Sequence, residues 1–215
     1  MAVPFAPYSG DDDLLAATLA DGRARVRVYR PSDVAVVLGR ASRAEVELRL
    51  ERCAADGVPV SRRPGGGCAV VIDPGDVVVS ATVPQTGLPR IRDLFASFSD
   101  WLLAALDGLG LRGVYREDVS DLALGDRKVG GACLYRPRGV ALYSATLLVE
   151  PRVELMERYL AHPPREPAYR RGRSHADFVG RLADLPGGWT ASSVAAGLGE
   201  TIAPPSFAAA GGGTS

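Results

Sequence analysis

The sequence predicts an α+β fold in which a mixed, largely antiparallel β-sheet is covered by helices. Short apolar or alternating segments are separated by turn residues, which is typical of hairpins. Residues 91–109 carry apolar side chains at helical spacing and predict one long amphipathic helix. Regular alternation of strands and helices is absent, which disfavours a Rossmann domain. The 215 residues have no visible repeat or domain boundary and suit a single domain.

The first part of the chain predicts two helices and two strands. Residues 11–20 begin with three aspartates, which stabilise the positive end of a helix. Residues 25–30 alternate between basic and apolar or aromatic side chains, and residues 33–39 are mostly apolar, so both segments predict strands. Residues 45–56 predict one helix, which Gly57 ends.

A run of glycines separates two further predicted strands, residues 58–63 and 68–72. Turn residues at 73–76 then lead into residues 77–83, another predicted strand. We therefore expect residues 68–72 and 77–83 to pair as a hairpin.

The second part of the chain predicts strands at residues 119–124 and 140–149. Helices are predicted at residues 153–160, 175–182 and 190–198. A loop rich in proline and arginine separates the first two of these helices. Its arginines, Arg165, Arg170, Arg171 and Arg173, either bind an acidic carrier protein or form an ordinary solvated loop.

Composition and charge argue against several classes of protein. The 25 basic and 25 acidic residues cancel, whereas a duplex binder usually carries a net basic field, so no nucleic-acid partner is expected. Neither a membrane span nor a secretion signal is visible, so we expect a cytoplasmic protein without membrane contact. The three cysteines, Cys53, Cys68 and Cys133, are too few for a disulfide framework and lack zinc-site spacing. We expect them to be small buried residues, and we predict no metal site.

Lysine occurs only once, at Lys128, among the 25 Lys and Arg residues. The two cations are nearly exchangeable on a surface, but a compact ammonium and a planar guanidinium are not exchangeable at a buried oxyanion. A lysine that survived by drift would lie at an arbitrary position. Lys128 instead lies in a glycine-flanked segment, predicted as a turn between two strands. This favours a role in stabilising negative charge on a carbonyl or phosphoryl oxygen over that of a solvated turn lysine.

The run of three glycines after Arg62 and Arg63 is the other candidate site. Glycines leave backbone N–H groups uncovered, so carboxylate or phosphate oxygens can approach them closely. The two arginines would add positive charge. The spacing fits neither a Walker A loop nor GxGxxG. Alone, the segment is equally well explained as a glycine-rich hairpin turn.

Together the two segments resemble the lipoate–protein ligase A and octanoyltransferase family, part of the biotin/lipoate A/B protein ligase superfamily. RRPGGGCAV, from residue 62, looks like the signature RRxSGGGAV. DRKVGGACLYRPRGVALYSATLLV, from residue 126, resembles a motif in which GRKISGSAYR leads into a strand. Residues 165–178 also match a loop of bacterial relatives. Pro64 and Gly130 depart from the pattern, since the family often has Ser or Thr at the first position and Ser or Ala at the second.

The resemblance implies a biotin/lipoate-ligase-like catalytic domain at residues 1–203, without the accessory C-terminal domain of many bacterial ligases, and a flexible tail at residues 204–215. It implies that Lys128 is the electrostatic catalyst and that Asp121 orients a metal, adenine or the incoming lysine. The residues implied to bind the acyl group and ATP are Arg62, Arg63, Gly65, Gly66, Gly67, Cys68, Ala69, Gly130, Gly131 and Ala132.

The implied reaction is that of a lipoate–protein ligase. ATP, as its Mg²⁺ complex, activates lipoate or octanoate to acyl-AMP, and a lysine of a carrier then takes the acyl group. The expected carrier is a lipoyl domain or a glycine-cleavage-type protein, and either a separate accessory subunit assists or activation is not this chain's task. Two alternatives remain open. One is transfer from an acyl-carrier protein through a thioester on Cys133 or Cys68. The other is a non-catalytic module that binds lipoate or a carrier domain.

Overall fold

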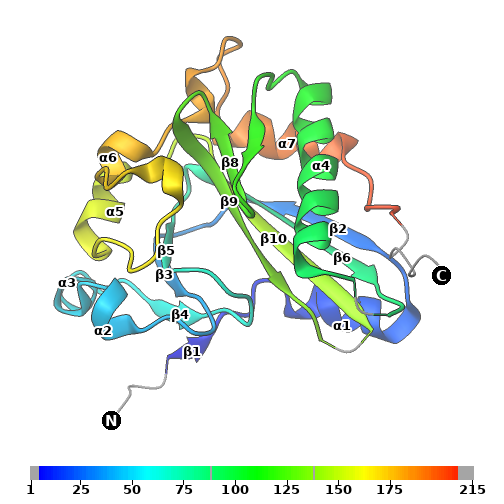
Figure 1. Ribbon diagram of the computed structural model, residues 1–215, viewed down its shortest axis with the longest axis horizontal. Helices are drawn as coiled ribbons and strands as arrows, with labels where there is room; N and C mark the ends of the chain where they lie inside the picture. Colours follow the sequence, from blue (N-terminus) through cyan, green and yellow to red (C-terminus); the bar gives the residue numbers. More distant parts are fainter. Residues whose placement is uncertain (1–4, 88, 138, 208–215) are drawn as a thin grey trace.

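Two β-sheets form the framework of the molecule. The computed structural model describes residues 5–87, 89–137 and 139–207 (Figure 1). The larger sheet is antiparallel throughout, in the order β2 (Arg25–Tyr29), β6 (Asp76–Pro84), β10 (Val140–Leu148), β9 (Arg127–Tyr135), β8 (Asp121–Leu124) and β7 (Tyr115–Glu117). The smaller sheet is mixed, in the order β1 (Ala6–Pro7), β4 (Val60–Arg62), β3 (Ala35–Leu38) and β5 (Val70–Ile72). The predicted α+β class, with a largely antiparallel sheet covered by helices, is confirmed.

The main apolar core lies between the larger sheet and two helices, α4 (Ile91–Leu109) and α7 (Ala191–Thr201). The bounds of α4 are those that its apolar spacing predicts. Phe98 of α4 is fully buried, and its ring stacks on that of Tyr143 with 4.9 Å between centroids. The opposite face of the sheet carries more polar residues, and α1 (Asp12–Asp21) covers only part of it. This leaves an open stretch of sheet for a site.

A second apolar core lies between the smaller sheet and the helices α2 (Ala44–Glu47), α3 (Leu50–Ala55) and α5 (Val153–Tyr159). The prediction of one helix at residues 45–56 is wrong, because the chain is extended at Leu48. Leu48 forms a β-bridge with Leu160, and the N–H of Arg49 donates to the carbonyl of Tyr159 at 2.8 Å. These long-range bonds break the helix at a point where its local pattern is continuous.

The hairpin predicted for residues 68–72 and 77–83 is also wrong. β5 pairs with β3 in the smaller sheet, whereas β6 lies between β2 and β10 in the larger one. The connecting turn is held by the carboxylate of Asp73, which accepts from the N–H groups of Gly75 at 2.7 Å and Arg152 at 3.0 Å. A side chain at Gly75 would clash with the carbonyl of Glu150, so the turn runs directly against the chain that follows β10. The turn therefore carries the chain from one sheet to the other.

The helix predicted at residues 175–182 is shorter than expected. It is divided into α6 (His175–Phe178) and a 3₁₀ turn, η2 (Leu182–Asp184). Between them Val179 forms a parallel bridge with Lys128, and the N–H of Gly180 donates to the carbonyl of Lys128 at 2.8 Å. This pairing draws the chain out of the helix and ties the segment to β9.

Of the predicted tail at residues 204–215, the structure describes residues 204–207, while residues 208–215 lie outside the described residues. Phe207 contacts Phe98 edge-to-face, with 4.8 Å between ring centroids, so this part of the tail packs on α4. None of the helices in the described ranges is long and apolar enough to cross a membrane.

Candidate active site

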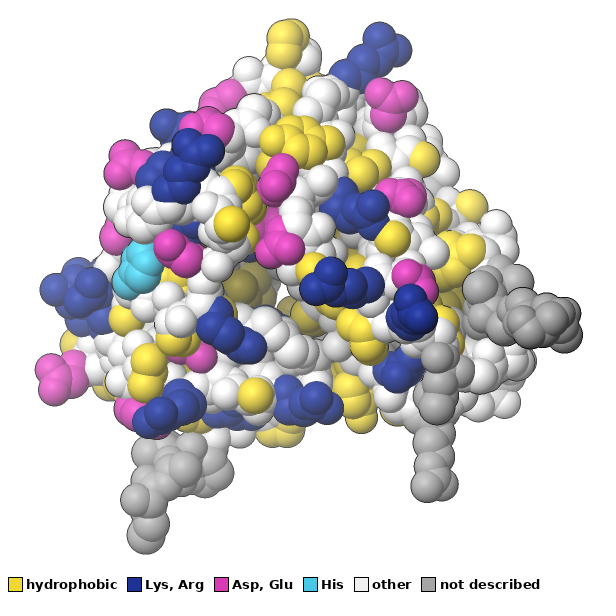
Figure 2. Space-filling view, in the orientation of Figure 1, with side chains coloured by type: hydrophobic (Ala, Val, Ile, Leu, Met, Phe, Trp, Pro, Cys, Tyr) yellow, Lys and Arg dark blue, Asp and Glu magenta, His cyan; other side chains and the backbone are white. Residues whose placement is uncertain are grey.

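A cavity of about 500 Å³ lies between the two sheets and is bounded on another side by α5 and residues from the 161–179 segment. Figure 2 shows a hollow near the middle of this face of the molecule. The volume is typical of small-molecule sites. One wall is apolar and is formed by Val37, Val70, Val71, Ile72, Val78, Leu148, Met156 and Leu160. The other walls carry the charged residues described below.

A β-bulge directs Lys128 into this cavity. Lys128 lies in β9, not on the predicted turn, which is formed by Gly125 and Asp126. Across the β8–β9 ladder Asp121 pairs with Gly131, but the register then shifts by one residue so that Lys128 pairs with Ala123.

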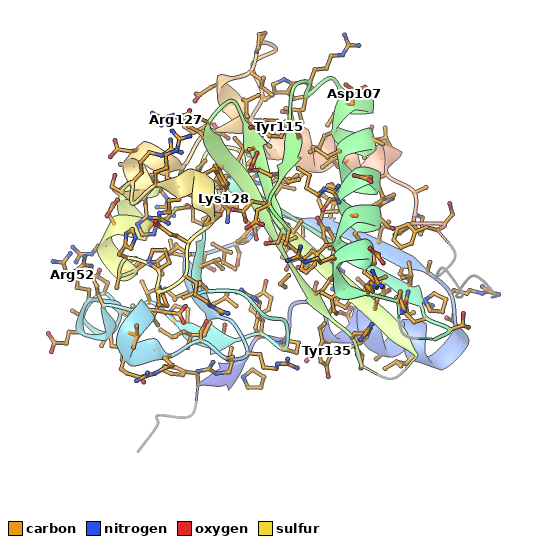
Figure 3. All side chains as sticks on the ribbon, in the orientation of Figure 1. Arg52, Asp107, Tyr115, Arg127, Lys128 and Tyr135 are labelled. Carbon is orange, nitrogen blue, oxygen red and sulfur yellow. The ribbon has the colours of Figure 1, made fainter. Side chains whose placement is uncertain are left out.

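The extra residue in β9, Val129, determines which face of the sheet the Lys128 side chain points to. In a regular strand, residues three apart point to opposite faces, so Lys128 and Gly131 would face opposite ways. The bulge at Val129 puts Lys128 on the same face as Gly131 and Asp121, while Val129 itself is buried in the main core. In Figure 3, Arg127 and Tyr135 mark the two ends of β9, and Lys128 lies toward α5 and α6.

Lys128 and Asp121 form an ion pair that lines the cavity. The Lys128 ammonium donates to Oδ1 of Asp121 at 2.7 Å, and the side chains are 28% and 9% exposed. The hydroxyl of Tyr169 donates to Oδ2 of Asp121 at 3.0 Å. Burial, and then the charge of Asp121, raise the pKa of the Tyr169 phenol, so this phenol stays a donor. An ammonium has three N–H donors, and Asp121 takes one, so the others are available to a ligand.

The glycines after the lysine differ in what they do. A Cβ on Gly131 would lie 3.0 Å from Nζ of Lys128, so the absence of a side chain leaves room for the ammonium. Gly130 points the other way, toward Leu122, and does not line the cavity. Ala132 lines the cavity, although its side chain packs against the main core. The three residues were predicted as one binding segment, but only Gly131 and Ala132 are part of the wall.

The two arginines before the glycine loop are bound mainly to backbone carbonyls. Arg62 donates to the carbonyls of Gly39 at 2.7 Å and Ser42 at 2.9 Å, and it lies outside the cavity lining. Arg63 lines the cavity, and its Nη2 donates to the carbonyls of Gly66 and Cys68, both at 2.8 Å. Arg63 therefore shapes the glycine loop and Arg62 the facing turn, roles that the sequence pattern did not reveal.

The glycine loop approaches its neighbours closely. A side chain at Gly39, in the facing turn, would clash with the carbonyl of Gly67. A Cβ on Gly65 would lie 2.8 Å from Sγ of Cys133, whereas Gly66 faces open space. Gly67 lines the cavity with φ of +92°, a conformation that glycine adopts without strain.

A buried carboxylate that sequence reasoning missed anchors the same loop. Glu47, 6% exposed, accepts from the N–H of Ala69 at 2.7 Å and from the hydroxyl of Ser42 at 3.0 Å. Its other oxygen accepts from the N–H of Arg43 at 3.1 Å. The N–H of Ala69 is thus already bonded within the protein, so Ala69 contributes to the cavity wall rather than a free donor.

The cysteines divide into two kinds. Cys53 is buried, as expected, but Cys68 and Cys133 are only partly buried and line the cavity. Burial raises the pKa of the Cys133 thiol, although the nearby Arg63 guanidinium opposes the effect. Cys133 is therefore a thiol at neutral pH, and a thiol is a weak nucleophile.

The 163–178 segment contributes side chains that the sequence pattern did not place in the cavity. Arg170, predicted as a carrier-binding or solvated residue, is 5% exposed, lies 5.0 Å from the ring centroid of Phe178, and lines the cavity. Its Nη2 is buried and has no hydrogen-bond partner within the described parts of the chain. Arg173 is paired with Asp126 at 2.9 Å, so neither arginine is a free surface charge. The arginine content of the loop and the resemblance of residues 165–178 to a loop of relatives pointed to this segment, but not to its place in the cavity wall.

His175 in the cavity wall and Glu157 beside it form a second titratable pair, also missed from sequence. His175 lines the cavity and is 8% exposed, and its Nδ1 lies 3.6 Å from Oε1 of Glu157. The same Glu157 oxygen accepts from the backbone N–H of His175 at 2.7 Å.

Among the residues that the structure describes, no cluster of three or more His, Cys, Asp or Glu side chains could hold a metal ion.

Sequence comparison identifies relatives across nearly the whole chain. The profile of the lipoyl protein ligase A/B catalytic domain matches residues 4–202. A relative from Aeropyrum pernix is 32% identical over 139 residues, which cover 65% of this chain and 51% of that protein. Lipoate-protein ligase A subunit 1 of Thermoplasma acidophilum is 27% identical over 169 residues, which cover 74% of this chain and 64% of that subunit. The chain thus spans about half to two thirds of the length of these relatives.

Solved structures have the same fold. A lipoate-protein ligase A bound with ATP is 25% identical, with a TM-score of 0.71 over 89% of this chain and 78% of that one. A Thermoplasma acidophilum protein with bound lipoic acid is 25% identical, with a TM-score of 0.67 over 85% and 73%. The archaeal bi-partite lipoate protein ligase, described with its E2 lipoyl domain, is 23% identical, with a TM-score of 0.72 over 92% and 82%. The match over residues 4–202 establishes that the chain belongs to the lipoyl protein ligase A/B catalytic-domain family.

Proposed function

We propose that this protein is a lipoate–protein ligase, which activates lipoate or octanoate with ATP and transfers the acyl group to a lysine of a carrier domain. The observation that carries the proposal is the Lys128 ammonium, held by Asp121 in a cavity that has both an apolar wall and a glycine loop. An acyl-AMP has an apolar chain, a carbonyl and a phosphate. The cavity offers a matching surface for each of these parts.

The acyl chain would lie along the apolar wall formed by β3, β5 and α5, where burial of its methylene groups stabilises binding. The carbonyl and phosphate oxygens would face Lys128, whose ammonium stabilises the negative charge that develops during each step. The open backbone at Gly66 would allow the phosphates close approach. ATP bound to one relative and lipoic acid bound to another support these two ligands. Mg²⁺ would enter with ATP as part of that substrate.

The proposed acceptor is a lipoyl domain or a glycine-cleavage-type carrier protein. One structural relative is described as a bi-partite ligase with its E2 lipoyl domain, and one sequence relative is named as subunit 1. We therefore propose that a second polypeptide assists activation, with this chain as the catalytic domain at residues 1–203. A cytoplasmic location fits an acceptor of this kind and also remains a proposal.

The transferase alternative is less well supported, because it requires a thiolate that attacks the acyl donor. Cys133 lies on β9, the strand that carries Lys128, but its thiol has a raised pKa and lies against Gly65. A purely binding module would not require a lysine where arginine is used at all other basic positions.

The first prediction concerns activation. The purified protein, assayed alone and with a candidate accessory subunit, should catalyse lipoate- or octanoate-dependent exchange of labelled pyrophosphate into ATP, because acyl-AMP formation is reversible. Omission of the acid is the control. Absence of exchange with both acids, together with acyl transfer from octanoyl-acyl-carrier protein, would establish the transferase alternative. Absence of both reactions would favour the alternative of a non-catalytic module that binds lipoate or a carrier domain.

The second prediction concerns the cysteines. Cys68→Ala and Cys133→Ala should each retain most of the ligase activity, because neither sulfur takes part in the reaction. Intact-mass measurement after incubation with octanoyl-acyl-carrier protein should detect no acyl adduct on the wild-type protein. A thioester that disappears in one of the two variants would contradict the ligase mechanism.

The third prediction concerns Lys128. Lys128→Arg should lose about 10²- to 10³-fold in single-turnover acyl transfer, nearly as much as Lys128→Ala, the cost typical of a lost electrostatic contact to a transition state. The planar guanidinium is wider than the ammonium that rests against Gly131. Both variants should retain the wild-type circular dichroism spectrum. Arg116→Lys, an exposed exchange on β7, is the matched control and should be unaffected. Near-normal transfer by Lys128→Arg would contradict the assignment of Lys128 to the active site.

A further inference from the structure

The ion pair of Lys128 and Asp121 stabilises charge, but transfer to a carrier lysine also requires removal of a proton. The carrier lysine attacks as a neutral amine, and the amide product has one N–H fewer than that amine, so one proton must leave during the attack. Asp121 is unsuited to accept this proton, because its two oxygens already accept from Lys128 at 2.7 Å and Tyr169 at 3.0 Å. The proton transfer therefore requires another base in the cavity.

His175 has the geometry of such a base. It is buried, it lines the cavity, and its Nδ1 lies 3.6 Å from Oε1 of Glu157, which leaves Nε2 as the nitrogen that can meet a substrate. A carboxylate beside one ring nitrogen fixes the orientation of an imidazole and stabilises the imidazolium that forms when the other nitrogen takes a proton.

The position of His175 also suits an acceptor that attacks at Lys128. Val179 bridges to Lys128, and the N–H of Val179 donates to the carbonyl of His175 at 2.8 Å. His175 is therefore one helical turn, about 5 Å along the axis, from the residue that pairs with the lysine. Phe178 and Val179 fill the wall between them.

The charged groups around His175 keep the ring neutral and its partner ionised. Burial and the charge of Arg170 lower the pKa of His175, while Glu157 opposes them and His162 adds a small lowering effect. Burial tends to raise the pKa of Glu157, but the backbone N–H of Ala176, the His175 ring when it is protonated, and the backbone N–H of His175 together outweigh this effect, so the pKa is lowered. From β9, Arg127 contacts the backbone carbonyl of Ala176 and not the ring.

We propose that His175, oriented by Glu157, is the general base that accepts the proton of the carrier lysine during acyl transfer. The inference rests on the proposed ligase function. The amine nitrogen forms a bond to the acyl carbon, the bond between that carbon and the phosphate oxygen breaks, and AMP leaves with the electron pair. The proton lost by the nitrogen goes to Nε2 of His175 and then to solvent. Activation of the carboxylate by ATP requires no such proton transfer, so His175 acts in the second half-reaction only.

The experiment separates the two half-reactions. Chemically prepared octanoyl-AMP is mixed with an excess of enzyme and carrier domain, and single-turnover transfer is followed between pH 5 and 9. His175→Ala should slow transfer at neutral pH by about 100-fold or more, the usual contribution of a general base. The lipoate- or octanoate-dependent exchange of pyrophosphate into ATP should be unchanged in this variant. Unchanged exchange would also show that the variant is folded and binds its substrates.

Three further measurements exclude a purely structural role. Wild-type transfer should rise with pH through a transition below about 6.5, where His175 becomes neutral, and His175→Ala should lack this transition. Added imidazole should restore part of the rate of His175→Ala by occupying the space left by the ring. Glu157→Gln keeps an oxygen that can accept from the N–H groups of His175 and Ala176 but removes the charge, so it should slow transfer and spare exchange.

The chain offers a matched control, since its only other histidine, His162, also lies beside a glutamate, 3.0 Å from Glu166, but does not line the cavity. His162→Ala should transfer at the wild-type rate. Wild-type transfer rates in His175→Ala, or a loss of exchange equal to the loss of transfer, would overturn the inference while leaving the ligase function intact. Failure of the wild-type protein itself to use octanoyl-AMP would refute the proposed function instead.

Discussion

The site depends on one extra residue in one strand. Val129 interrupts the β8–β9 ladder, and because of this bulge Lys128 lies on the same face as Asp121 and Gly131. Without it, the ammonium would point into the core that α4 and α7 cover, where a charge without a partner is costly. The bulge allows Val129 to pack in the main core while the neighbouring Lys128 side chain lines the cavity. The bridge from Val179 to Lys128 then fastens the third side of the cavity to the same point.

The two kinds of basic side chain have separate tasks around this cavity. The guanidinium groups of Arg62 and Arg63 each donate to several carbonyls and so hold the glycine loop and its facing turn in shape. A planar group with five donors is suited to that work. Lys128 donates to one acceptor among the described residues, Asp121, and so retains donors for a ligand. Glu47 adds a buried acceptor beneath the loop. A loop held in shape and an ammonium with donors to spare suit the acyl-adenylate that we propose as the ligand.

Local patterns predicted the parts of the molecule that local forces determine. The helical spacing of residues 91–109 gave the bounds of α4, and the lone lysine pointed to Lys128 without any knowledge of its strand. Long-range pairing was not predictable in this way. The break at Leu48, the division of β5 and β6 between two sheets, and the bulge at Val129 all depend on partners distant in sequence. For the same reason His175, with its partner on another helix, carried no signal.

The central claim, that Lys128 meets the acyl-adenylate, can be measured directly because the chain has a single lysine. Protein labelled with ¹³C,¹⁵N-lysine should give one lysine side-chain signal in an NMR spectrum. Addition of a non-hydrolysable lipoyl-adenylate analogue should shift the Cε and Nζ resonances strongly and slow the exchange of the ammonium protons, since new oxygens would accept from them. Saturating binding of the analogue with unchanged lysine resonances would contradict the account.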